Sequence, residues 1–154
     1  MNEAYHIYMK QASSQGDYID IEAYPNFKGL KYSKCTGLND KGKRKNVYIE
    51  SYPEDTEARV YMGNTVTREP TDVTLTLLFT GTVAERQLAY KNFCAYVEND
   101  KIYFYDNIRN KEVLLILPDP VKVSEEVFKG SEPYTEIPFK FQNIWGESHD
   151  RPNV

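Results

Sequence analysis

The second half of the chain alternates apolar and polar side chains with the period of a β-strand. In residues 72–80 the apolar positions are every second residue and three of the intervening positions are threonines. The apolar set is Val73, Leu75, Leu77 and Phe79. Residues 134–143 repeat this pattern, with Ile137, Phe139 and Phe141 as the apolar set. Period-two alternation predicts strands with one buried and one exposed face.

A helix is predicted between these strands, over residues 82–98. Thr82 and Glu85 have the spacing of a capping box, in which each side chain bonds the backbone N–H of the other residue. The apolar positions that follow have helical spacing. They are Ala89, Tyr90, Phe93, Cys94 and Val97. We expect Tyr90, Phe93 and Val97 to pack on the sheet face formed by Val73, Leu75, Leu77 and Phe79.

Further strands are predicted on both sides of the helix. Residues 101–106 and 111–117 flank a turn at 107–110, as in a hairpin. Residues 121–130 also suggest a strand. Pro138 cannot donate a ladder hydrogen bond, so the strand at 134–143 is expected to lie at an edge or to contain a bulge there.

The first half of the chain is less regular. Residues 5–10, 17–24 and 47–52 suggest short strands, and 57–63 suggests a strand or part of a loop. Residues 37–46 are polar and are expected to form a loop or a hairpin tip. We predict a single domain over 1–154, in which 1–46 is an irregular region with short strands and a basic loop. Residues 144–154 are expected to be a flexible tail.

This order of elements predicts a mainly β, α+β fold. An antiparallel β-sandwich or split barrel with one flanking helix at 82–98 buries the apolar faces most simply. A chain of 154 residues can bury such a core without disulfides. The two cysteines, Cys35 and Cys94, are far apart in sequence, and we expect reduced thiols in an intracellular protein.

Composition narrows the possible functions. The net charge is −4, so no overall positive field attracts nucleic acid or anionic lipid. No apolar stretch is long enough for a membrane-spanning helix, and the N-terminus lacks a signal-peptide pattern. Thirteen tyrosines against one tryptophan favour strands and interfaces.

No motif predicts catalysis, a metal ion or a cofactor. His6 and His149 lack a second ligand at metal-binding spacing. The consecutive Ser148, His149 and Asp150 cannot converge as a catalytic triad, whose members come from separate segments. The many carboxylates are expected on exposed faces, and no phosphate-binding glycine loop is present. The sequence therefore favours a structural protein over an enzyme.

One basic cluster is a candidate contact site. Its members are Lys41, Lys43, Arg44 and Lys45. Such a run is usual at a solvated loop tip, but it could also contact an acidic surface of a neighbouring subunit or nucleic acid phosphates. In an acidic protein a protein partner is the better of these two contacts.

The order of segments resembles the N-terminal domain of tail-tube and distal-tail proteins of long-tailed bacteriophages, over about residues 47–146. The resemblance rests on VYIESYP at 47–53, PTDVTLTLLFTG, the helix AERQLAYKNFCAYVEN, KIYFYDNIRNKEVLLIL, and the closing YTEIPFKFQNIWG. It implies a structural subunit of a phage or prophage tail that assembles in the bacterial cytoplasm into a ring, usually hexameric. Its implied partners are copies of itself and other tail or baseplate proteins, with DNA only passing through the channel.

Two other functions remain open at the level of sequence. A β-sandwich binding module, for example for carbohydrate, would use Tyr24, Tyr32, Tyr61 and Trp145 as a stacking platform. A small enzyme would need a pair of carboxylates held across a cleft.

Overall fold

A computed structural model describes residues 6–45, 47–50, 53–54, 56–62, 66–121 and 133–150. The strands are β1 (Ile7–Gln11), β2 (Ile19–Asp20), β3 (Leu30–Thr36), β4 (Val47–Glu50), β5 (Arg59–Met62), β6 (Thr71–Thr80), β7 (Ile102–Asp106), β8 (Lys111–Ile116), β9 (Tyr134–Asn143) and β10 (His149–Asp150). A short 3-10 helix, η1 (Pro25–Phe27), and one α-helix, α1 (Val83–Glu98), complete the described part of the chain. Residues 122–130, most of an expected strand, lie outside it.

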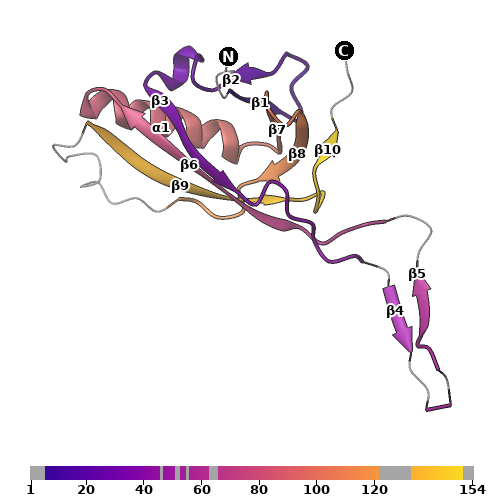
Figure 1. The fold of residues 1–154 in the computed structure, drawn as a ribbon. Helices are drawn as coiled ribbons and strands as arrows, with labels where there is room; N and C mark the ends of the chain where they lie inside the picture. Colours follow the sequence, from indigo (N-terminus) through magenta and orange to yellow (C-terminus); the bar gives the residue numbers. More distant parts are fainter. Residues whose placement is uncertain are drawn as a thin grey trace.

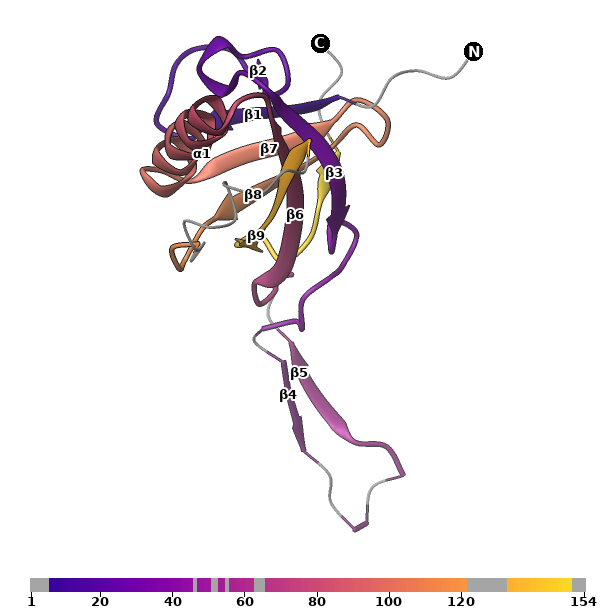
Figure 2. The same ribbon diagram turned by 90° about the vertical axis from the view of Figure 1, so that its left-hand side faces the viewer.

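Eight of the strands form one antiparallel sheet with the order β2-β1-β7-β8-β9-β6-β3, and β10 pairs with β8. Strands β8 and β9 pair only through Leu115 with Asn143 and Ile116 with Gln142, so the sheet turns a corner there. Its two halves cross at a steep angle (Figure 2). Helix α1 lies along β6 and β9, with η1 on its other side (Figure 1). The predicted β-sandwich with one flanking helix is confirmed.

The core lies between α1 and the paired strands β6 and β9. The apolar residues of the two strands face each other in register and are buried: Val73, Leu75, Leu77 and Phe79 on β6, and Ile137, Phe139 and Phe141 on β9. Phe93 of α1 packs edge-on against Phe139, with ring centroids 4.9 Å apart. Tyr90 packs against Phe79 at 6.0 Å, and Val97 is buried. The helix begins after Thr82, whose Oγ1 accepts the N–H of Glu85 at 3.2 Å.

The predictions for the N-terminal region and the tail need correction. The region 1–46, expected to hold only short strands, contains the seven-residue strand β3. Its alternation is broken by a bulge between Tyr32 and Lys34, which hides the strand in the sequence. The expected flexible tail is folded over residues 144–150, where β10 pairs with β8.

The expected edge or bulge at Pro138 is wrong, because β9 lies between β8 and β6 and its register with β6 continues through Pro138 opposite Thr76. The residues of β9 that pair with β8 are Gln142 and Asn143, so Pro138 lies outside that short contact. At the β3 edge, the N–H of Tyr32 donates to Glu22 Oε1 at 2.8 Å, and Lys31 and Lys34 are exposed. Satisfied amides and exposed lysines protect an edge strand from unintended pairing. Among the described residues, no helix has the length and apolarity to cross a membrane.

Candidate functional site

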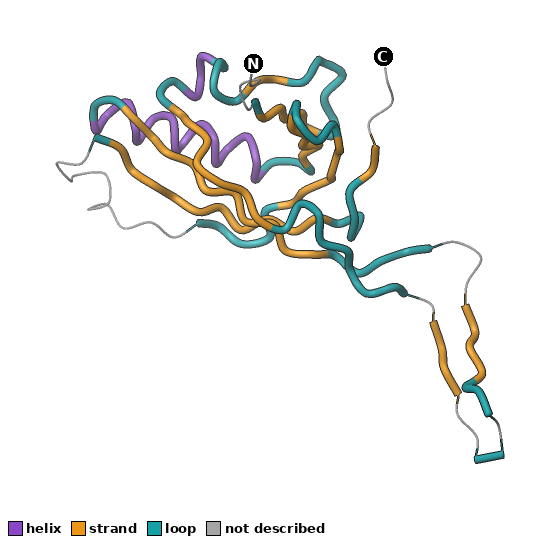
Figure 3. Tube along the Cα trace, in the orientation of Figure 1, coloured by secondary structure: helices purple, strands orange, loops and turns teal. Residues whose placement is uncertain are grey.

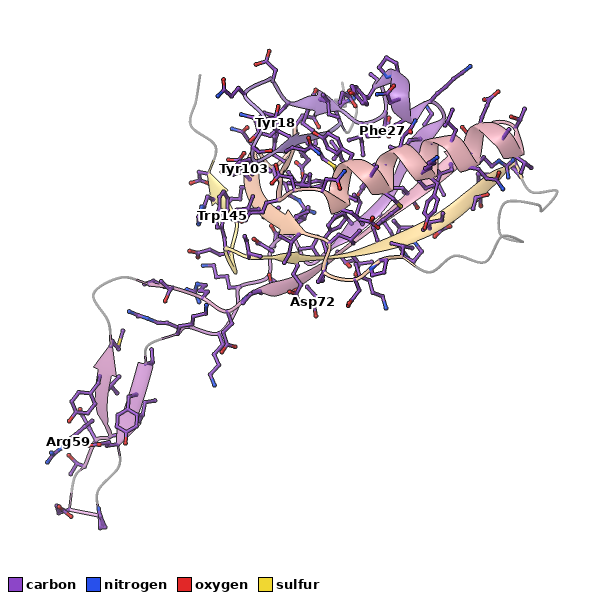
Figure 4. The ribbon with its side chains drawn as sticks, turned by 180° about the vertical axis from the view of Figure 1, so that it is seen from behind. Tyr18, Phe27, Arg59, Asp72, Tyr103 and Trp145 are labelled. Atoms are coloured by element: carbon purple, nitrogen blue, oxygen red, sulfur yellow. The ribbon has the colours of Figure 1, made fainter. Side chains whose placement is uncertain are left out.

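The most prominent feature outside the core is an arm formed by the described parts of residues 43–69. Its outer part is the separate two-stranded sheet of β4 and β5, which extends away from the body (Figures 1 and 2). Loop segments separate these strands from the body sheet (Figure 3). Figure 4 places Arg59 on the arm, far from Asp72 at the start of β6. Among the described residues of the arm, contacts with the body are therefore found at its root.

Backbone hydrogen bonds fix the root of the arm. Lys45 N–H donates to Thr67 O and Glu69 N–H donates to Lys43 O, both at 2.8 Å. Residues 37–45 therefore form a loop, as expected, and this loop lies at the root of the arm and not at a hairpin tip. Arg68 lies opposite Arg44 in an isolated antiparallel bridge. The outgoing and returning segments of the root are therefore paired at this point.

The C-terminal segment braces this root against the body. Arg68 Nε lies 3.2 Å from Glu147 Oε2, and Arg68 Nη1 donates to Gly42 O at 3.1 Å. Gly42 N–H donates to Gly146 O at 2.7 Å. The fully buried Asn143 shapes the turn, because its side chain donates to Glu147 O and accepts from the Trp145 N–H, both at 3.1 Å.

Two glycines allow this close approach. A Cβ on Gly42 would lie 1.8 Å from Glu69 O, and one on Gly146 would lie 2.5 Å from the same oxygen. Gly146 also has a φ of +70°, which L residues rarely adopt. The root is therefore tightly packed against residues 68 and 69.

The two faces of the arm differ in chemistry. Cross-strand pairing places Val47 opposite Met62 and Ile49 opposite Val60, which gives an aliphatic face. The other face carries Tyr48 opposite Tyr61, with ring centroids 6.0 Å apart, and Glu50 opposite Arg59.

These side chains are unusually exposed for apolar residues. Ile49 is 61% exposed, Tyr48 60% and Val60 52%. A two-stranded hairpin alone is marginally stable in water, and contiguous exposed apolar residues mark interaction sites. The sequence predicted strands here but not their exposure. The sequence feature that could have indicated this exposure is the run of three successive apolar residues in each strand, which places apolar side chains on both faces of the arm.

The basic cluster lies at the root of the arm. Lys41, Lys43 and Lys45 are exposed, whereas Arg44 is half-buried in the bridge to Arg68. The predicted core residues lie elsewhere, within the body between α1 and the sheet. The structure therefore separates the candidate contact residues from the residues that stabilise the fold.

The described residues of the body offer few groups arranged for metal binding or nucleophilic catalysis. Within the described ranges, no three His, Cys, Asp or Glu side chains cluster as a metal site. Burial raises the pKa of the Cys35 thiol to about 12 and that of Cys94 to about 11. Both are therefore protonated and weakly nucleophilic at neutral pH. His149 stacks on Trp145 with ring centroids 4.2 Å apart, and its Nε2 lies 3.8 Å from Glu147 Oε1.

The four candidates for a carbohydrate platform lie on separate elements. Tyr24 precedes η1, Tyr32 lies on β3, Tyr61 on β5, and Trp145 follows β9. Tyr24 borders an open hollow of about 240 Å³ between η1 and α1, which also has amide side chains in its lining. Two of those amides already donate within the protein, from Gln11 to Tyr96 O and from Asn92 to Asn26 O, each at 2.9 Å.

Comparisons with known proteins find a likeness among solved structures. No protein-family model and no curated protein sequence matches the chain. Among solved structures, the chain is similar to one in the structure of the phage p2 baseplate in its activated conformation with Sr, with a TM-score of 0.58 and 13% sequence identity. The match covers 92% of this chain and 45% of that chain, so this chain spans less than half of the protein it matches. The chain therefore has a fold that is found in a phage baseplate.

Proposed function

We propose that this protein is a structural subunit of a bacteriophage or prophage tail and has no catalytic role. Copies of the chain would join into a closed ring, as part of the tail tube or of the distal-tail hub. The fold shared with a phage baseplate chain supports this proposal. The order of segments described above, which resembles tail-tube and distal-tail proteins, supports it independently.

The observation that carries the proposal is the exposed arm. Its aliphatic face consists of Val47, Ile49, Val60 and Met62, and its other face presents Tyr48 and Tyr61. Burying apolar surface is favourable by about 25 cal/mol per Å², so these faces gain stability when a partner covers them. An arm that binds the next copy would make a head-to-tail contact, and such contacts form rings when the rotation closes.

The ring would be hexameric by the same resemblance, with other tail or baseplate proteins stacked on it. DNA would pass through its channel without specific contacts, in keeping with a net charge of −4. Assembly would take place in the bacterial cytoplasm, and the product would belong to the virion tail.

The test is a double substitution on the aliphatic face, Ile49→Asp with Val60→Asp. These charges are tolerated in the free subunit, where both residues are exposed, but are costly in a covered interface. We expect the fold to remain and the oligomer to dissociate, as measured by light scattering coupled to gel filtration. The matched control is Leu88→Asp with Ile108→Asp, which places the same two charges on residues of the body that are 59% and 53% exposed. Equal assembly of the double variant and the wild type would contradict the proposal.

A further inference from the structure

Charge is distributed unevenly along the arm. The root carries Lys41, Lys43 and Lys45, and the tip carries Glu54 and Glu57. All five side chains are exposed. Within the described part of the chain, none of the five side chains takes part in an ion pair or hydrogen bond. The arm is thus basic at one end, apolar in the middle and acidic at the other end.

The two charged ends cannot neutralise each other within one subunit. They lie at opposite ends of the hairpin (Figures 1 and 2). The four residues of β4, which lie between Lys45 and Glu54 in the chain, span roughly 10 Å at about 3.3 Å per residue. The Debye length is about 8 Å at physiological ionic strength, so the attraction over this distance is screened. Any direct pairing of the two charged ends therefore involves a second molecule.

We propose that the acidic tip of one arm, Glu54 and Glu57, docks on the basic root of the neighbouring copy, Lys43 and Lys45 with Lys41 beside them. This inference rests on the proposed function, because it specifies how the arm contacts the next subunit. A second copy of this chain is the expected partner, because the root of its arm carries the positive charges that complement the acidic tip. The aliphatic and tyrosine faces between the two ends would be buried by the same contact.

The contact also gives the assembly a direction. Each subunit offers one tip and one root at different places, so every interface joins unlike surfaces and the contact is head-to-tail. Opposite charges speed association and fix the register of an interface, whereas like charges oppose it. Tip-to-root pairing would therefore select one alignment of arm on neighbour from the many that apolar burial alone permits.

The test uses two charge-reversed variants of the full chain. The tip variant carries Glu54→Lys and Glu57→Lys, and the root variant carries Lys43→Glu and Lys45→Glu. Each places like charges at every interface and should weaken assembly about tenfold or more. A matched control, Lys28→Glu with Lys91→Glu, makes the same change in net charge as the root variant, on exposed residues of the body. It should assemble like the wild type.

The decisive measurement is the oligomer formed by a one-to-one mixture of the two variants. In a mixed ring with alternating variants, each reversed tip meets a reversed root and each native tip meets a native root. The mixture, and the chain carrying all four substitutions, should therefore regain assembly. Weakened single variants without rescue in the mixture would overturn tip-to-root pairing, as would single variants that assemble normally. Failure of the wild type itself to assemble would instead refute the ring, and this inference with it.

Discussion

Phe93 occupies the centre of the contact between α1 and the sheet. It is fully buried, and its ring packs against both Phe139 and Phe27, with centroid distances of 4.9 and 5.4 Å. It connects the helix to β9 on one side and to η1 on the other. The helical spacing in the sequence identified this residue correctly. It did not identify Phe27, because the residues around η1 have no clear period.

Truncation of Phe93 should therefore destabilise the whole body. Loss of a buried phenylalanine side chain costs about 3–5 kcal/mol, because apolar burial is lost and a cavity remains. For a domain of this size we expect the Tm of Phe93→Ala to fall by about 6–20 °C. Leu88→Ala on the same helix is the control, since Leu88 is exposed and its Tm should hardly change. A Phe93→Ala protein that melts with the wild type in calorimetry would contradict this packing.

At the scale of elements, the sequence predicted the regular parts of the fold and missed the irregular ones. The strands at β6 and β9 and the helix α1 have clear periods because each buries one continuous face. Strand β3 was missed because its bulge shifts the alternation by one residue. The folded segment 144–150 was missed because its order depends on Asn143 and on pairing with β8, contacts that local patterns do not report.

The candidate site was predictable only in pieces. Residues 47–52 and 57–63 suggested strands, and Lys41, Lys43, Arg44 and Lys45 suggested a contact. Sequence does not show whether a strand joins the main sheet or stands apart from it, since this is decided by long-range pairing. The arm was therefore identified only in the structure. The structure places the basic cluster at the root of the arm, whereas the sequence had suggested a loop tip.

The junction of arm and body can be tested at Gly146. In Gly146→Ala the new Cβ would meet Glu69 O at 2.5 Å and Arg68 Cβ at 2.7 Å, at a backbone φ of +70°. We expect a cost of at least about 1 kcal/mol, because an L residue is strained in this conformation. The effect should be local: the Gly42, Lys45 and Glu69 amides should exchange with deuterium faster, while those of β6 remain protected.

Gly16→Ala is the control for this substitution. Its Cβ would lie 3.4 Å from Ser14 Oγ, an acceptable contact, so both stability and exchange should remain as in the wild type. Unchanged exchange at the arm root in Gly146→Ala would show that the C-terminal turn does not brace the arm.

At the scale of the whole molecule, a stable body carries an arm whose exposed faces the body does not cover. The body supplies the fold that is also found in a phage baseplate, and its core residues lie away from the arm. The arm supplies exposed apolar surface and opposite charge at its two ends. In the proposed assembly, the core would set the stability of each subunit and the arm would set its contact with the next copy.

The central claim is that copies of this chain close into a ring, and the mass of the assembled species tests it most directly. Native mass spectrometry over a range of protein concentrations should show one dominant oligomer at a fixed whole-number multiple of 17.9 kDa, with six copies as the expected number. Closure predicts that this species stops growing as concentration rises, since a completed ring has no free interface. A monomer at all concentrations, or a continuous ladder of sizes without a dominant species, would contradict the account.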